Sequence, residues 1–259
     1  MFVDSHTHLF HPDLVSRLNG VMGRARSAGV EKMICVGTDL SSSEKSLSIA
    51  SRYVDVFASV GVHPHDAGDA PSGYLERLRD LAAHPMAVAL GEIGLDFFRP
   101  LSPRGRQKEV FARQLELAAE LDLPVIVHCR NATNEVLDVV ESSGCSRGVI
   151  HCFSGTPDVA KRFMSLGFLI SFTGNVTFPP TGGKHRHWPD DLLREVPLES
   201  VMLETDSPFL APVPVRGRVN EPAHIPHIAG AVARAKGITA EEVGDVTSAT
   251  ARRFFGLPE

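Results

Sequence analysis

The chain of 259 residues has few cysteines, one tryptophan and no long uncharged apolar stretch. Its four cysteines show no C-x-x-C spacing, and a chain of this size needs no disulfides, so we expect reduced thiols and a cytoplasmic location. The first residues lack the basic and apolar regions of a secretory signal, and no apolar run is long enough to span a bilayer. The composition therefore predicts neither a disulfide scaffold nor a membrane protein.

Charge of one sign is not in marked excess either, because 26 Lys and Arg residues oppose 31 Asp and Glu residues, for a net charge of −5. This slightly acidic balance argues against a broad basic surface that coats nucleic acid, although a local patch can be hidden within the sum. With 43% hydrophobic residues, the chain has the composition of an ordinary globular protein with a large core.

Eight short apolar, β-branched runs alternate with segments of helical periodicity. The runs cover residues 1–3, 32–36, 56–60, 86–90, 124–127, 148–150, 168–172 and 201–203. Helices are expected over residues 41–53, 104–121, 131–142 and 221–235, and from an N-cap at Thr239 to Phe255. Eight strand–helix units in about 250 residues are typical of a (β/α)8 TIM barrel. We therefore predict this fold as a single domain over residues 1–259. An open doubly wound sheet is the alternative, although no phosphate-binding glycine motif follows an early strand.

Imidazoles and carboxylates follow six of the eight apolar runs. In a (β/α)8 barrel the C-terminal ends of the strands form the face that carries the chemistry. Removing such polar groups from water beside a core is costly unless they bind a partner there. A metal ion shared by all of them would be such a partner. The residues are Asp4, His6 and His8 after the first run, His63 and His65 after the third, Glu92 after the fourth, His128 after the fifth, His151 after the sixth, and Glu204 and Asp206 after the eighth.

Nitrogen and carboxylate donors without cysteine favour divalent zinc, manganese, magnesium or cobalt. His6 and His8 project from the same side of their strand because side chains alternate, so both can reach one ion. Six ligands exceed the needs of one tetrahedral ion but suit two ions about 3.5 to 4 Å apart. Glu92 on a middle strand is the natural bridge between His6 and His8 on one side and His128 and His151 on the other, and Asp206 can complete the site of the first pair.

Other polar residues near these ligands have different expected roles. Glu204 is expected to orient a ligand imidazole instead of binding metal. His63 and His65, which flank a proline, are equally well interpreted as a ligand pair or as substrate contacts at the rim. Cys129 and Cys152 should face the opposite side of their strands from the adjacent histidines, so we do not expect them to bind metal.

Seven short blocks occur in order at the ends of successive predicted strands. They are DSHTH at 4–8, GVHPH at 61–65, GEIGLD at 91–96, VHCR at 127–130, HCFSG at 151–155, LETDSP at 203–208 and RGRVNEP at 216–222. Together they resemble the blocks of the TatD family of metal-dependent deoxyribonucleases, over essentially the whole chain. The resemblance implies a (β/α)8 barrel, a dinuclear centre and hydrolysis of phosphodiester bonds in DNA, often from the 3′ end. It also implies that His6, His8 and Asp206 hold one metal, that His128 and His151 hold the other, and that Glu92 bridges them.

The expected reaction is attack on phosphorus by a water activated between two metal ions, with Glu92 and Asp206 as catalytic residues and Asp206 as proton acceptor. Arg130 is expected to pair with a phosphate oxygen, because its planar fork of donors matches phosphate. Arg216 and Asn220 follow the last strand, a region that often binds phosphate in such barrels. The expected partner is a DNA single strand or strand end, with no membrane and no obligate protein partner.

Two alternatives remain at this stage. One is a dinuclear hydrolase of a small amide, lactone or phosphoester, since the fold does not fix the substrate. The other is a noncatalytic metal-dependent binding protein, which the retained bridging Glu92 disfavours. Cys129, Val219 and Thr250 depart from the family pattern, and residues 177–191, with a basic cluster at 184–187, form a predicted long loop. These features concern the substrate rim and leave the ligands intact.

Overall fold

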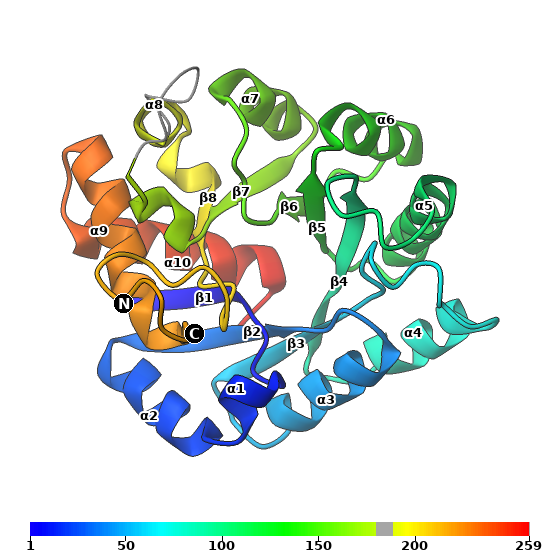
Figure 1. The fold of residues 1–259 in the computed structure, drawn as a ribbon, viewed down its shortest axis with the longest axis horizontal. Coiled ribbons are helices and arrows are strands. Elements are labelled where there is room, and N and C mark those ends of the chain that lie inside the picture. Colours follow the sequence, from blue (N-terminus) through cyan, green and yellow to red (C-terminus); the bar gives the residue numbers. More distant parts are fainter. Residues whose placement is uncertain (180–188, 259) are drawn as a thin grey trace.

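The computed structural model describes residues 1–179 and 189–258, and its strands form one parallel eight-stranded sheet in chain order (Figure 1). The sheet closes on itself, because Thr7 forms a parallel bridge with Ser207 and the amide of Asp206 donates to the carbonyl of His6 at 2.9 Å. The predicted barrel is thereby confirmed over the open sheet. The strands are β1 (Phe2–Thr7), β2 (Val30–Val36), β3 (Val56–Val60), β4 (Ala87–Asp96), β5 (Val125–Arg130), β6 (Gly148–Ile150), β7 (Phe168–Phe172) and β8 (Val201–Leu203).

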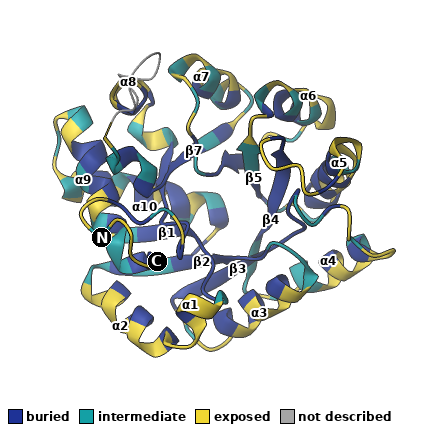
Figure 2. Ribbon diagram, in the orientation of Figure 1, coloured by how far each residue is buried: buried dark blue, intermediate teal, exposed yellow. Residues whose placement is uncertain are grey.

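Helices surround the barrel, with buried faces toward the strands and exposed faces outward (Figure 2). They are α1 (Pro12–Val15), α2 (Leu18–Ser27), α3 (Leu40–Ala50), α4 (Tyr74–Ala82), α5 (Arg104–Glu120), α6 (Thr133–Ser143), α7 (Pro157–Ser165), α8 (Asp190–Glu195), α9 (Ile225–Lys236) and α10 (Ala240–Phe255). Short 3-10 turns, η1 (Gly174–Thr177), η3 (Leu198–Ser200) and η4 (Pro222–His224), complete the connections. The predicted helix over 221–235 is therefore corrected at its start: η4 comes first and the α-helix begins at Ile225.

Helix α10 closes the N-terminal end of the barrel. Thr239 caps it as predicted, in a capping box with Glu242. Ala251 and Phe255 of α10 pack into a buried apolar cluster with side chains of the barrel interior, such as Val3. Because apolar side chains fill much of this end, the room for a polar site lies toward the C-terminal ends of the strands.

Three strands run further than their apolar runs predict. β1 continues to Thr7, β4 to Asp96 and β5 to Arg130, so His6, Glu92 and His128 lie within the strands themselves. Their polarity hides the continuation in the sequence, because a hydrophobic pattern ends where a strand enters a polar barrel mouth. Backbone pairing with neighbouring strands therefore fixes the positions of these three side chains.

The predicted loop over residues 177–191 is described only in part. Its basic cluster at 184–187 lies outside the described residues, and Asp190 and Asp191 belong to α8 rather than to a loop. Within the described ranges, no helix is both long and apolar enough to cross a membrane.

Candidate metal centre

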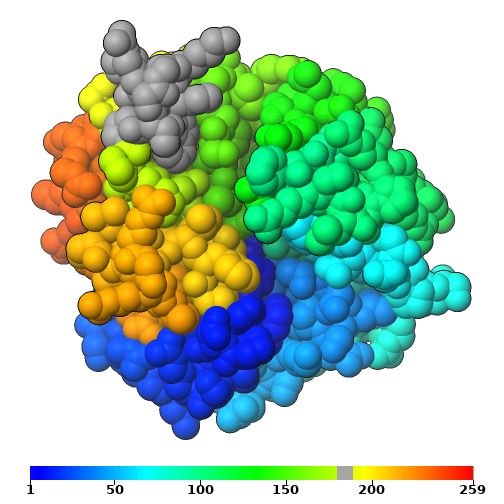
Figure 3. All heavy atoms as spheres, in the orientation of Figure 1, coloured from blue at the N-terminus to red at the C-terminus, as the bar shows by residue number. Residues whose placement is uncertain are grey.

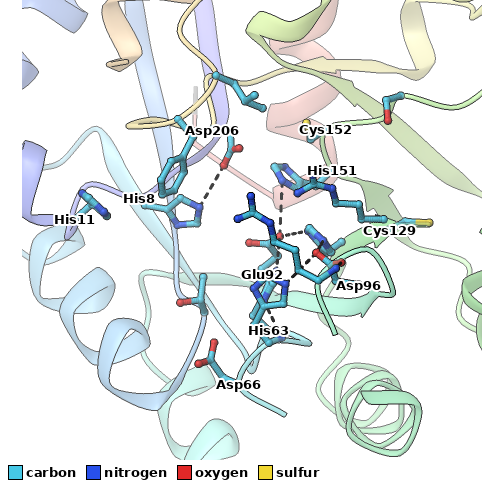
Figure 4. Close-up of a pocket in the computed structure, with 18 of the residues that line it drawn as sticks. His8, His11, His63, Asp66, Glu92, Asp96, Cys129, His151, Cys152 and Asp206 are labelled. Atoms are coloured by element: carbon cyan, nitrogen blue, oxygen red, sulfur yellow. Dashed lines mark hydrogen bonds and ion pairs between the residues drawn. The ribbon is translucent and has the colours of Figure 1, made fainter. Parts of the chain in front are cut away.

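The six side chains predicted to bind metal meet at the C-terminal ends of the strands. Five of them line a cavity of about 660 Å³, and His6 lies fully buried beside it. Figure 4 shows Glu92 near the middle, with His8, His11 and Asp206 on one side and Asp96, Cys129 and His151 on the other. In Figure 3 the blue N-terminal segment, the green middle of the chain and the gold segment after β8 meet around a hollow on this face. Residues from distant parts of the chain therefore share one pocket.

His6 and His8 aim at a common point. Their Nε2 atoms lie 3.3 Å apart, and a carboxylate oxygen of Asp206 lies 3.8 Å from His6 Nε2 and 3.3 Å from His8 Nε2. Nδ1 of His8 donates to the carbonyl of Val36 at 2.9 Å, which leaves its Nε2 free to bind metal when the ring is neutral. Two imidazole nitrogens and a carboxylate facing each other at these distances form a ligand set for a divalent cation.

Glu92 lies between two groups of imidazoles. Its Oε2 atom is 3.5 Å from Nε2 of His6, whereas Oε1 is 2.8 Å from Nδ1 of His128, 3.5 Å from Nε2 of His63 and 3.7 Å from Nε2 of His151. Burial alone would raise the pKa of Glu92, but His63, His151 and His128 outweigh it and hold this pKa well below its usual range. An ionised carboxylate with one oxygen toward each group has the arrangement of a bridging ligand.

Three sets of donor atoms fit a metal ion, each with its atoms within 4.8 Å of one another. They are His6, His8 and Glu92; His6, His151 and Asp206; and His63, Glu92 and His128. Burial lowers the pKa of His6, and it lowers the pKa of His63 to about 3, so both rings are neutral at pH 7 and have a lone pair to donate. The buried nitrogen and oxygen donors therefore fit a divalent metal.

His63 and His65 separate in the structure, although the sequence treated them together. His63 lies in the ligand set with Glu92 and His128, whereas His65 is one-quarter exposed and its Nε2 lies 3.0 Å from a carboxylate oxygen of Asp96. The same oxygen of Asp96 is 3.2 Å from Nε2 of His128. The interpretation as a ligand pair therefore fails for His65, while His63 takes a position suited to a ligand.

Asp96 is a site residue that the candidate list missed. It is fully buried at the end of β4, and its Oδ1 accepts hydrogen bonds from the amides of Phe98 at 2.9 Å and Arg99 at 2.8 Å. Burial would raise its pKa, but His128, the Arg99 amide and His65 together hold it well below its usual range. Its position four residues after Glu92 on one strand puts both on the same face, so alternation could have revealed it.

Glu204 contacts a candidate ligand, as the sequence predicts. Its carboxylate lies 2.8 Å from Nδ1 of His151 and accepts a hydrogen bond from the amide of Cys152 at 2.7 Å. The contact with His151 lies off the N–H direction, so we treat it as electrostatic rather than as a directed hydrogen bond. Burial opposes a charge on His151, but Glu204 and Glu92 outweigh it and raise the pKa of His151 to about 10. Metal and proton therefore compete for this imidazole.

Asn220 does not reach the substrate pocket, which corrects the substrate-binding role predicted for it. It is fully buried, and its amide donates to the carbonyls of Thr205 at 2.8 Å and Phe209 at 2.7 Å. Between these two carbonyls the backbone of Asp206 has a φ of 53°, a left-handed conformation that residues other than glycine rarely adopt. Asn220 therefore positions the turn that carries Asp206.

The two arginines predicted to bind phosphate differ in position. Arg130 lines the cavity, and its guanidinium lies 4.3 Å from the ring centroid of Phe98. Arg216 is exposed and is not among the residues that line the cavity, and its guanidinium lies 4.0 Å from the ring centroid of Phe178. Only Arg130 therefore has the predicted position beside the candidate ligands.

The two thiols next to candidate ligands differ in position. Sγ of Cys129 lies 4.0 Å from the Thr133 hydroxyl of α6 and points away from the cavity in Figure 4, as predicted, whereas Cys152 lines the cavity, contrary to the prediction. Cys152 follows the short strand β6 with a φ of 49°, so strand alternation no longer applies to it, and its Sγ lies 3.4 Å from the Thr173 hydroxyl. Burial raises the pKa of Cys129 to about 11 and holds the pKa of Cys152 well above its usual range. Neither thiol belongs to a ligand set among the described residues.

Comparison with known proteins places this site in context. Residues 3–256 match the family model described as TatD related DNase. The chain is 37% identical over 259 residues to the uncharacterized metal-dependent hydrolase YabD of Bacillus subtilis, covering 99% of this chain and all of that one. It is also 37% identical over 243 residues to the 3′-5′ ssDNA/RNA exonuclease TatD of Klebsiella pneumoniae, covering 92% and 91% of the two chains. The crystal structure of YjjV, a TatD homolog from Escherichia coli, superposes with a TM-score of 0.92 at 29% identity, covering 99% and 98%.

Proposed function

The chain belongs to the TatD-related DNase family of metal-dependent hydrolases, and from this premise we propose that it cleaves phosphodiester bonds in single-stranded DNA or at strand ends, in the 3′ to 5′ direction. The relative from Klebsiella pneumoniae that is named a 3′-5′ ssDNA/RNA exonuclease supports this substrate class. The proposed enzyme is one domain formed by residues 1–259 and acts in the cytoplasm, where its four free thiols stay reduced.

The observation that supports the proposal best is the position of Glu92 between two groups of imidazoles. His6, His8 and Asp206 would hold one divalent ion, His128 and His151 the other, and Glu92 would bridge them. His63 is a further donor for the second ion, because it lies 3.5 Å from Glu92. When bound, such ions polarise a phosphate and lower the pKa of a coordinated water toward neutrality.

Other side chains of the site would accept a proton, bind the phosphate and position the ligands. Burial would raise the pKa of Asp206, but His8, His151 and His6 outweigh it and lower this pKa, so its carboxylate is ionised at neutral pH and can accept a proton. Arg130 on the cavity wall would bind a nonbridging phosphate oxygen. Glu204 and Asn220 would hold His151 and the Asp206 turn in place.

The cavity wall favours a phosphate over the neutral substrates of the alternative hydrolase. Arg99 and Arg130 both line the cavity, and among the described residues neither lies within 4.0 Å of a carboxylate oxygen. A guanidinium without a carboxylate partner attracts a phosphodiester but offers little to an amide or lactone.

Metal analysis combined with end-labelled DNA cleavage tests the proposal. The purified protein is analysed for bound elements, stripped with a chelator and reloaded with zinc, manganese, magnesium or cobalt singly. We expect about two ions per chain and release of mononucleotides from the 3′ end only. Stoichiometric metal and strand binding without turnover would instead favour the noncatalytic alternative, and cleavage only of a small ester or amide would favour the other hydrolase.

A further inference from the structure

Phe209 is a half-exposed phenyl ring beside the candidate metal centre. It is 50% exposed and lines the same cavity as His8 and Asp206. Its ring makes T-shaped contacts with two imidazoles, with centroid distances of 5.5 Å to His11 and 6.1 Å to His8. A half-exposed aromatic ring at the mouth of a polar pocket is available for a flat ligand to stack on.

The backbone of Phe209 is held firmly although its side chain is exposed. Its amide donates to the carbonyl of Asp206 at 2.9 Å, and its carbonyl accepts from the buried amide of Asn220 at 2.7 Å. The backbone of Phe209 is therefore fixed three residues from a proposed metal ligand. An aromatic side chain with only two rotatable bonds on a fixed backbone loses little conformational entropy when a flat ligand stacks on it.

The same cavity also carries positive charge. Arg99 and Arg130 line it, and the amides of Phe98 and Arg99 are anchored to Asp96 at 2.9 and 2.8 Å. Among the residues that the structure describes, these two guanidinium groups have no ion-pair partner, whereas Arg24 and Arg26 elsewhere in the chain pair with carboxylates at 2.6 and 2.7 Å. Figure 4 shows the side of the pocket with His8, His11 and Asp206 facing the side with Asp96 and Cys129 across Glu92.

We propose that one base of a nucleic-acid strand stacks on Phe209 while Arg99 and Arg130, which line the same cavity, bind an adjoining phosphate. This inference rests on the proposed function and adds a residue that selects unpaired nucleotides. A base in a duplex is already stacked and paired, and releasing it costs free energy, so a platform for a free base favours a single strand. Phe209 thereby acts as a specificity-determining residue, and the metal ligands perform the hydrolysis.

Replacing the ring by a smaller apolar side chain tests the stacking. Phe209→Leu keeps an apolar side chain, Phe209→Tyr keeps the ring, and Phe254→Leu is a matched control at the N-terminal end of the barrel, where Phe254 packs with the α10 cluster. The substrates are a single-stranded oligonucleotide and the same strand with abasic sites at its 3′ end. We expect Phe209→Leu to lower kcat/KM on the natural strand about 5- to 150-fold, mainly through KM, as loss of one stacked base does. Phe209→Tyr should restore most of the activity.

The abasic strand separates stacking from packing. The wild type and Phe254→Leu should prefer the natural strand over the abasic one, and Phe209→Leu should lose most of this preference. An unchanged preference in Phe209→Leu overturns the inference while leaving the nuclease intact. Equal losses on both strands together with reduced metal content would assign Phe209 to packing on His8 and also overturn it. If the metal-loaded wild type cleaves neither strand, the proposed function itself fails.

Discussion

Replacing Glu204 by glutamine tests whether the carboxylate behind His151 is needed for metal binding. Glu204 is 1% exposed, and its oxygen lies 2.8 Å from Nδ1 of His151. Removing such a partner of a metal-binding histidine weakens metal binding or activity about 10- to 100-fold, or about 1.4 to 2.7 kcal/mol. Glutamine has nearly the same volume and can still accept the hydrogen bond from the Cys152 amide, so the fold should persist.

The same variant should change how metal affinity depends on pH. The pKa of His151 is raised to about 10 by Glu204 and Glu92 against the effect of burial, so the metal-free protein carries a proton there at neutral pH. Metal binding must release this proton, so wild-type affinity should rise about tenfold per pH unit from this group below its pKa. Without the charge of Glu204 this pKa falls, and the rise should flatten at a lower pH. Calorimetric titration of metal at pH 6.5, 7.5 and 8.5 measures both effects.

Glu199→Gln is the matched control, because Glu199 is an exposed carboxylate five residues earlier. It should bind metal like the wild type at every pH. The reasoning would be refuted if Glu204→Gln kept wild-type affinity with an unchanged pH dependence, or if both variants lost affinity equally.

Three further changes have separate expected outcomes. Glu92→Ala should lower kcat/KM on DNA about a thousandfold or more and reduce metal content while the circular dichroism spectrum stays native; full activity would contradict the bridging role. Arg130→Ala should raise KM for a single strand about 10-fold or more with metal content unchanged, since a charged hydrogen bond to phosphate is lost. Burial opposes ionisation of Glu221, but hydrogen bonds from Arg24 at 2.6 and 2.7 Å outweigh it and lower its pKa. This stabilisation is present above the unfolded value of about 4.3 and is lost as pH falls through the folded pKa, so chelator-treated Glu221→Gln should lose less Tm between about pH 5 and pH 3 than the wild type.

Much of the fold could be predicted because apolar runs mark buried parallel strands. β3, β6, β7 and β8 have the predicted bounds, since each is apolar or small over its whole length. β1, β4 and β5 end beyond the prediction because each carries a polar side chain into the barrel mouth, where burial comes from other polar groups. A pattern of hydrophobicity along one strand contains no information about such partners.

The site was predictable where one strand places two donors together, and less so where the contact is made across the fold. His6 and His8 follow from alternation alone, whereas the contact between His65 and Asp96 joins residues 31 positions apart. Asn220 and Cys152 were misplaced because the backbone beside them adopts left-handed conformations, which the residue types Asp206 and Cys152 do not indicate. Such conformations depend on hydrogen bonds from distant residues.

An overall charge of −5 is compatible with a nucleic-acid substrate, because the acidic and basic side chains near the cavity differ in burial and in their partners. The carboxylates of Glu92, Glu204 and Asp206 are buried and face imidazoles, so they contribute little field to an approaching strand. Arg99 and Arg130 on the cavity wall have no carboxylate partner in the part of the chain that the structure describes. A strand therefore meets two guanidinium groups and the proposed metal ions rather than an extended basic surface. Binding that relies on so few phosphate contacts should be modest for long DNA and should depend only weakly on salt, because few counterions are released.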